Sequence, residues 1–175
     1  TGSTFNGTGK LNVANEAVGI YSKGNNTLNV DVTAAGDKTT GIFIDGTSTI
    51  SGTVAATGTA TAGAVGVYGS RGAVTIGAAG LVLNTNSGRG TGMYLTDGAS
   101  ATGGTITVNN TAAGTKNIGV YYSKGTASGT VTNGSVISIA NNESIGIYAA
   151  DGINLVNTKN ITSTGLNNNI ASYIG

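Results

Sequence analysis

The chain has 175 residues, of which 31 are Gly, and its eight basic and seven acidic residues leave a net charge of +1. So little charge argues against charged disorder and provides no basic patch for nucleic acid. The sequence also has no run of about 18 apolar residues that could span a membrane. Because His and Cys are absent, Ser–His–Asp triads, Cys–His dyads and the usual zinc sites are excluded. We therefore expect no cofactor, no nucleic-acid partner and no membrane insertion of this segment.

A short phrase recurs along the chain: an aliphatic residue or Thr, then Gly, an aliphatic residue and an aromatic one. It first appears as VGIY at residues 18–21 and returns as TGIF, VGVY, TGMY, IGVY and IGIY. Its glycines are Gly19, Gly41, Gly66, Gly92, Gly119 and Gly146. A degraded seventh copy, residues 170–173, has Ala in the Gly position. Since the glycines are 22 to 27 residues apart, the sequence predicts a repeat architecture with a period of about 25 residues.

The third repeat shows most clearly what one period contains. Residues 64–70 (AVGVYGS), 73–76 (AVTI) and 81–85 (LVLNT) are apolar segments bounded by Gly, Asn and Ser, the pattern of short strands and turns. Leucine-rich repeats would need a Leu/Asn consensus, and propeller blades need about 40 residues. We predict an all-β, right-handed parallel β-helix in one domain, residues 1–175. Each rung should have about 25 residues and three short strands, in six to seven rungs.

The direction of each side chain follows from strand alternation. The aliphatic residues on both sides of Gly, such as Val65 and Val67, should point into the core, and Gly and the aromatic residue should point outward. The least regular stretch, residues 47–63, is expected to bulge from the shaft. The chain does not begin with Met and is repetitive at both ends, so we interpret it as a segment of a longer protein whose open strand edges favour end-to-end self-association.

The aromatic positions should form one column along the solenoid, because equivalent residues of successive rungs lie about 4.8 Å apart. This aromatic column is Tyr21, Phe43, Tyr68, Tyr94, Tyr121, Tyr148 and Tyr173. Two interpretations are open: a ladder of stacked rings that stabilises the sheet, or a stripe about 29 Å long that contacts a sugar or a protein partner.

In the first six copies, a charged residue follows the aromatic residue and precedes a Gly. In chain order these residues are Lys23, Asp45, Arg71, Asp97, Lys124 and Asp151. Their signs alternate, and opposite charges on neighbouring strands attract each other weakly. The pattern predicts a structural charge ladder that holds the rungs in register, with Arg71 between Asp45 and Asp97.

The repeats VGIYSKG, IGVYYSKG and IGIYAADG resemble the passenger domains of type V autotransporter adhesins. They are most similar to the large Gly-, Asn- and Thr-rich passengers of fusobacterial outer-membrane adhesins. The resemblance covers the whole chain at the level of the repeat. It implies export to the bacterial cell surface through an outer-membrane barrel, and adhesion to a host-cell receptor, a glycan or a partner bacterium. No binding residue is implied by it.

Two other functions remain open, along with two forms of the adhesin hypothesis. A polysaccharide lyase or hydrolase would need converging carboxylates, for which Asp45 and Asp97 beside Arg71 are the candidates. The alternating charges explain the same residues without catalysis, so we expect no enzyme. An ice-binding solenoid would need aligned Thr-x-Thr triplets; candidates are residues 47–49, 105–107 and 130–132, but the third and sixth rungs break the array. Within the adhesin hypothesis, the segment is either a stalk or itself a binding surface.

Overall fold

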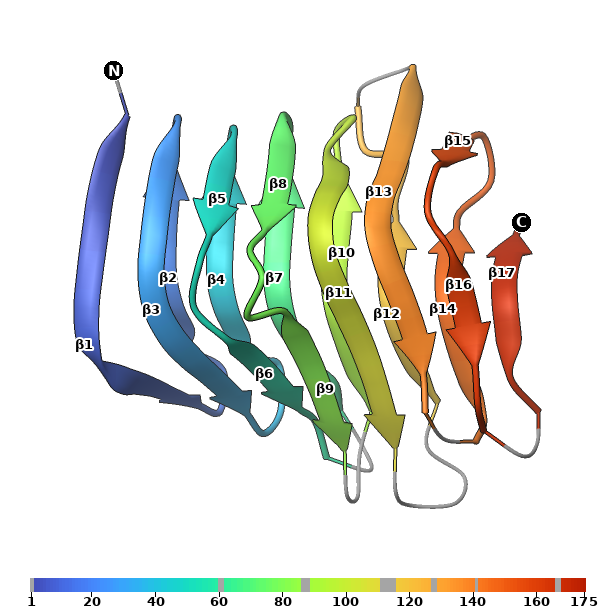
Figure 1. Ribbon diagram of the computed structural model, residues 1–175, viewed down its shortest axis with the longest axis horizontal. Coiled ribbons are helices and arrows are strands. Elements are labelled where there is room, and N and C mark those ends of the chain that lie inside the picture. Colours follow the sequence, from blue (N-terminus) through green and yellow to red (C-terminus); the bar gives the residue numbers. More distant parts are fainter. Residues whose placement is uncertain are drawn as a thin grey trace.

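The protein is a parallel β-solenoid of about six turns. The computed structural model describes residues 2–59, 62–85, 89–110, 116–126, 129–140, 142–165 and 168–175, and every regular element in them is a strand. The strands form two parallel sheets that run side by side along the long axis, with the N-terminus and the C-terminus at opposite ends (Figure 1). The predicted all-β parallel β-helix with a period of about 25 residues is therefore confirmed.

The first sheet, which we call the motif sheet, contains the recurrent Gly phrase. Its seven strands follow one another in chain order. They are β2 (Val18–Lys23), β4 (Thr40–Asp45), β7 (Ala64–Ser70), β10 (Gly90–Thr96), β12 (Asn117–Tyr122), β14 (Ser144–Ala149) and β17 (Ile170–Ile174).

The second sheet has ten strands. They are β1 (Ser3–Ala14), β3 (Asn26–Ala35), β5 (Ser48–Ile50), β6 (Val54–Thr57), β8 (Ala73–Ile76), β9 (Leu81–Thr85), β11 (Ser100–Asn110), β13 (Thr130–Ile139), β15 (Asn154–Asn157) and β16 (Ile161–Ser163). Three rungs contribute two short strands each to this sheet: β5 and β6, β8 and β9, and β15 and β16. In other rungs one long strand, β3, β11 or β13, covers the same region. The rungs with a long strand therefore have two strands instead of the predicted three.

The bend within β11 shows how one strand crosses the corner. Gly103 and Gly104 have φ angles of +68° and +50°, which residues with a Cβ rarely adopt. The pairing of β11 with β13 shifts register between Thr102 and Thr105, so the corner is a bulge inside a continuous strand. In the third rung, residues 77–80 break the same region into β8 and β9.

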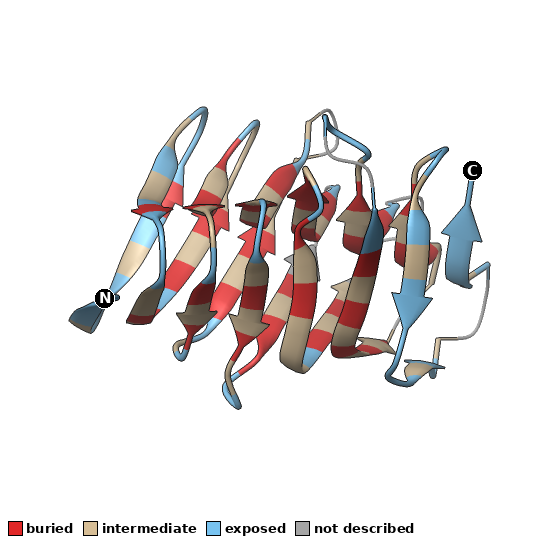
Figure 2. Cartoon of the chain, turned by 90° about the horizontal axis from the view of Figure 1, so that it is seen from above, coloured by how far each residue is buried: buried red, intermediate tan, exposed pale blue. Residues whose placement is uncertain are grey.

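The core is a narrow column of aliphatic side chains from both sheets. Buried residues fill the middle of the solenoid, and exposed residues gather at its two ends (Figure 2). Leu81, Leu83, Ile106 and Ile137 of the second sheet are fully buried, as is Ile147 of the motif sheet. Each rung contributes so few of these side chains that it depends on its neighbours for a closed core.

The inward and outward positions of the motif sheet differ from the prediction at Gly. In β7, Val65 is half-buried and faces outward, whereas Gly66 and Val67 are both buried. A Cβ at Gly66 would lie 3.3 Å from Val54 Cγ1 and 3.5 Å from Leu81 Cδ1, both in the second sheet. The prediction that the residue before Gly points inward is therefore wrong, because strict alternation is broken at Gly and two consecutive positions face the core.

The stretch 47–63 does not bulge over its described part. Strand β5 pairs with β3 and β8, and strand β6 pairs with β3 and β9. Val54 and Ala56 are buried in the core. Residues 60–61 lie outside the described part of the chain.

Candidate functional site

The seven predicted aromatic residues form one continuous stack on the outer surface of the motif sheet. Each is paired in register with the next, from Tyr21 opposite Phe43 to Tyr148 opposite Tyr173. Successive ring centroids are 4.7 to 5.4 Å apart, and the angles between ring planes are 6° to 26°. Centroid distances in this range make favourable aromatic pairs.

The stacking decides which part of each ring is available to a ligand. Both faces of the five inner rings are covered by neighbouring rings, so these rings present their edges and, except for Phe43, their hydroxyl groups. Only Tyr21 and Tyr173 have a ring face outside the stack, and they are 62% and 44% exposed. Partial burial raises the pKa of Tyr68 and of Tyr121 above the usual value. A sugar that needs an open ring face therefore finds one only at the two ends of the column.

A second column of side chains runs beside the rings on the same surface. It consists of the residues before each Gly, and all seven are paired in register: Val18, Thr40, Val65, Thr91, Ile118, Ile145 and Ile170. Five of the seven are Val or Ile. We call the aromatic column and this column together the aromatic–aliphatic face. The sequence predicted the aromatic column of this face but not the second column, because the residues before Gly were assigned to the core.

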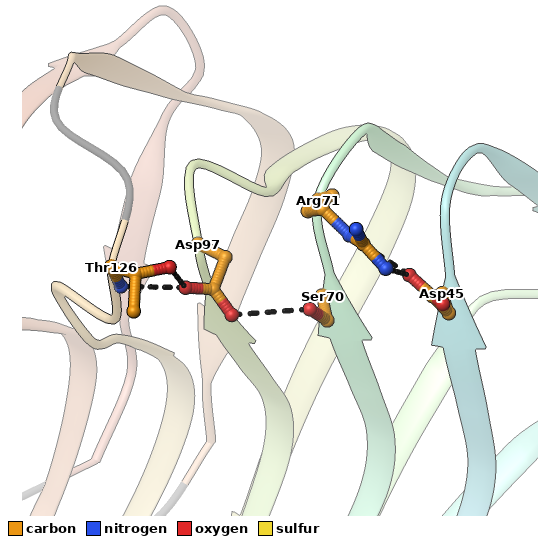
Figure 3. A network of polar contacts seen from close by, with 5 residues as sticks. All are labelled: Asp45, Ser70, Arg71, Asp97 and Thr126. Carbon is orange, nitrogen blue, oxygen red and sulfur yellow. Dashed lines mark hydrogen bonds and ion pairs between the residues drawn. The ribbon is translucent and has the colours of Figure 1, made fainter.

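The charged residues do not form a single ladder. Lys23 and Asp45 are paired within β2 and β4, but the residue of β7 opposite Asp45 is Ser70. Arg71 lies one position further on, where its φ is +65°. Its guanidinium still reaches back to the preceding rung: Arg71 Nε donates to Asp45 Oδ1 at 3.0 Å, and Arg71 Nη2 forms an ion pair with the same oxygen (Figure 3).

Asp97 has different partners from the predicted one. Its Oδ1 accepts hydrogen bonds from Thr126 N at 2.6 Å and Thr126 Oγ1 at 2.9 Å, and its Oδ2 accepts one from Ser70 Oγ at 3.2 Å (Figure 3). The carboxylate thus binds the rungs on both sides, but through Ser and Thr. Further along, the Lys124 side chain lies against Gly152, the residue after Asp151. The predicted position of Arg71 between two carboxylates is wrong on the Asp97 side.

A carboxylate that bonds a Thr one rung later occurs elsewhere in the solenoid. Asp31 Oδ1 accepts hydrogen bonds from Thr53 N at 2.7 Å and from Thr53 Oγ1 at 2.8 Å. These bonds lower the pKa of Asp31. We call this contact of an Asp carboxylate with the backbone N–H and hydroxyl group of a Thr one rung later a clasp. Its sequence signal is an Asp followed by a Thr 22 to 29 residues later. Such pairs are common in a Thr-rich chain, so the clasp can be identified only when the strand register is known.

The second sheet carries a threonine column that sequence reasoning missed. Its members are Thr4, Thr27, Thr49, Thr75 and Thr102, paired in register. The hydroxyl groups of Thr75 and Thr102 are 2.8 Å apart and bond each other. The three Thr-x-Thr triplets considered for ice binding do not align, since Thr105 pairs with Val136 and Thr130 with Asn154.

In comparisons with known proteins, no protein-family model, no curated protein and no solved structure matches this chain. The described residues contain no group of three or more acidic, His or Cys side chains that could hold a metal ion. In the same part of the chain, no helix is long and apolar enough to cross a membrane.

Proposed function

We propose that this chain is a non-catalytic shaft segment of a bacterial surface adhesin of the type V autotransporter class. In this proposal it is displayed outside the cell and holds adhesive parts of a longer protein away from the outer membrane. The repeated Gly-Ile-Tyr phrases supply the resemblance to such passengers. The partners of the complete adhesin would be a host-cell receptor, a glycan or another bacterium.

The observation that favours a shaft is the unbroken ring stack. All six steps from Tyr21 to Tyr173 keep centroid distances of 5.4 Å or less, so the described rungs follow one another without a hinge. Each aromatic pair in such a stack contributes about 0.5–1.5 kcal/mol. The stacked rings thereby stabilise a continuous rod. The carboxylates that could serve a catalytic site are bonded to residues of neighbouring rungs at the corners.

The carboxylates considered for polysaccharide hydrolysis illustrate that last point. Asp45 is bonded to Arg71, and Asp97 is bonded to Ser70 and Thr126. Both carboxylates are thus engaged by side chains of neighbouring rungs instead of converging on one open site, as a pair of catalytic carboxylates would. The enzyme alternative therefore has less support than the shaft.

A second form of the adhesin proposal is supported by the aromatic–aliphatic face. Its two columns place Val, Ile and Tyr side chains on a surface with no charged residue between them, and contiguous apolar surface of this kind is typical of protein-binding sites. In this form, the segment itself binds a protein partner through ring edges, hydroxyl groups and aliphatic side chains.

One experiment separates the two forms. Cells that display the complete protein are compared with cells whose protein carries Tyr94→Ser and Ile118→Ser, which alter the face at neighbouring rungs. A shaft predicts unchanged attachment to host cells and to a glycan array, because the adhesive part lies elsewhere. A binding face predicts loss of attachment. Thr49→Ala with Thr75→Ala on the second sheet is the matched control.

A deletion tests the shaft directly. Removing residues 92–118 deletes one period, from Gly92 up to the residue before Gly119, and keeps the Gly register. A shaft should tolerate this loss of about 4.8 Å with attachment retained. Failure of the intact protein to reach the cell surface would contradict the adhesin proposal itself.

A further inference from the structure

A third column of side chains borders the aromatic–aliphatic face, where the chain enters each strand of the motif sheet. This entry column consists of the residues two positions before the aliphatic column: Glu16, Lys38, Gly63, Arg89, Lys116, Glu143 and Asn168. Arg89 and Lys116 are exposed, the residues that directly follow them are buried, and the next residues, Thr91 and Ile118, are half-buried and paired in register. Since alternate residues of a strand face the same side, Arg89 and Lys116 lie on the outer surface beside this pair.

Arg89 and Lys116 are like charges at equivalent positions of neighbouring rungs. The rungs are about 4.8 Å apart, and like charges on neighbouring strands repel each other. Elsewhere in the entry column the neighbours attract: Lys38 Nζ and Glu16 Oε1 form an ion pair at 3.1 Å. Neither Arg89 nor Lys116 forms an ion pair with a carboxylate of the described residues, which include every charged side chain of the protein. An unfavourable local arrangement of this kind is expected where a site serves a function.

The backbone also sets these two residues apart from most of the entry column. Four other members have φ angles between +49° and +58°: Glu16, Lys38, Glu143 and Asn168. The φ angles of Arg89 and Lys116 are negative, as is usual for residues with a Cβ. Lys116 and Glu143 therefore differ in backbone conformation, and they form no ion pair although they are opposite charges in neighbouring rungs. Both cations are thus available to a ligand.

The neighbouring columns decide which anionic partner fits the two cations. Tyr94 and Tyr121 are stacked with their centroids 4.9 Å apart, so a glycan finds ring edges and hydroxyl groups here but no open ring face to stack on. The side chain of Ile118 and the methyl group of Thr91 lie between the rings and the cations, and they suit apolar side chains of a protein. An Arg guanidinium matches the two oxygens of a carboxylate, and a Lys ammonium adds a further donor.

We propose that Arg89 and Lys116 bind a carboxylate of an acidic protein segment, whose adjoining apolar residues cover Thr91 and Ile118. The proposal rests on the second form of the proposed function, in which the segment itself binds a protein, and it names the chemistry of that partner. Charge complementarity would select the acidic end of the partner, and the aliphatic column would select the apolar part. Strands β10 and β12 each pair with a strand on both sides (Figure 1), so the site lies within the solenoid and not at its ends.

A pair of peptides that differ only in charge tests the proposal. The first has the sequence GEEVLVG and the second the sequence GKKVLVG, both with blocked termini. Each is titrated to millimolar concentration into the isotope-labelled 175-residue chain, and amide chemical shifts are followed by NMR. We expect shifts at Thr91 and Ile118 with the Glu peptide, which diminish at high salt because ions screen exposed charges. Binding of the Lys peptide should be at least about tenfold weaker.

A double variant separates the two cations from the overall charge of the protein. Arg89→Gln with Lys116→Gln removes both charges at exposed positions, where such changes have little effect on folding. Lys10→Gln with Lys159→Gln is the matched control, because it removes the same net charge from β1 and from the turn between β15 and β16. We expect the first variant to bind the Glu peptide at least about fivefold more weakly than the unmodified chain, and the control to bind it equally well.

Three results would overturn the proposal. The first is the absence of shifts at Thr91 and Ile118 with millimolar Glu peptide. The second is equal binding of the two peptides, or an equal loss of binding in the two double variants. The third is displacement of the Glu peptide by a heparin disaccharide at a lower concentration than the peptide itself, which would assign the cations to a sulfated glycan. These measurements use the purified chain, so the site can fail while the adhesin proposal stands, and cell attachment tests that proposal separately.

Discussion

The guanidinium of Arg71 bonds the carboxylate of Asp45 in the preceding rung, and the two side chains are 65% and 14% exposed. An ion pair of this exposure contributes little to stability, because water and salt screen it. We expect Arg71→Ala to lower the free energy of unfolding by about 0.5 kcal/mol, and Arg71→Asp to lower it by about 1 kcal/mol because two carboxylates then face each other. Urea melts at low and high salt check both values, and the difference between the variants should shrink at high salt.

Replacement of Asp97 should be more harmful than replacement of Arg71. Asp97 accepts hydrogen bonds from Thr126 and from Ser70, so its removal releases a backbone N–H and two hydroxyl groups. We expect Asp97→Ala to lower the free energy of unfolding by about 1–3 kcal/mol. Asp97→Asn, which keeps one acceptor oxygen, should lose less. If Asp97→Ala unfolds at the same urea concentration as Arg71→Ala, the clasp with Thr126 does not stabilise the corner.

The glycines of the motif sheet should not tolerate a methyl group. A Cβ at Gly92 would lie 2.6 Å from the Gly119 oxygen and 2.9 Å from Leu81 Cδ2. We expect Gly92→Ala to lower the free energy of unfolding by about 1–3 kcal/mol, the usual range for overpacking. Thr91→Ala is the matched control, since the neighbouring side chain faces outward and its loss should cost below about 0.5 kcal/mol. Equal effects of the two substitutions would contradict the inward direction of Gly.

The ring stack should weaken at alkaline pH. Partial burial raises the pKa of Tyr68 and of Tyr121 above the value of 10.0 for an isolated tyrosine. A raised pKa in the folded state means that the neutral ring stabilises the fold at pH values below 10. That contribution is lost as the pH rises through the folded-state pKa. Urea melts at pH 9 and pH 11, together with tyrosinate absorbance, measure this loss.

A Phe substitution provides the control for that experiment. Phe43 occupies the same column between Tyr21 and Tyr68, so the stack accepts a ring without a hydroxyl group. Tyr68→Phe with Tyr121→Phe should keep the stability at pH 9 and lose less of it at pH 11 than the unmodified chain. An equal loss in both proteins would assign the alkaline effect to other groups.

Much of the solenoid could be predicted because its repeats are explicit in the sequence. The segments 64–70, 73–76 and 81–85 were expected as strands and are β7, β8 and β9 with the same bounds. The direction of Gly could not be predicted from alternation, because the break at Gly depends on how closely the two sheets approach. Only the contact of Gly66 with Val54 and Leu81 reveals it.

The break in register between Asp45 and Arg71 was visible in the spacing, whereas the absence of a contact between Arg71 and Asp97 was not, because these two residues have the same spacing. Lys23 and Asp45 come two residues after their aromatic residues, whereas Arg71 and Asp97 come three residues after theirs. A shift of one residue moves a side chain from the strand into the corner. From the corner, Arg71 bonds Asp45 of the preceding rung, and Asp97 accepts hydrogen bonds from Ser70 and Thr126 instead.

The one-residue lengthening of these corners has a consequence for how such a chain changes over generations. Extra residues are taken up in corners, as after Tyr68, and in the bulge of β11, so rungs of 22 to 27 residues keep the same ring and Gly columns. Genetic exchange between any two copies of the phrase would therefore join complete rungs, even when the copies differ in length. The number of rungs is free to drift by recombination, and each gain or loss alters the reach of the rod by about 4.8 Å without redesign of its core.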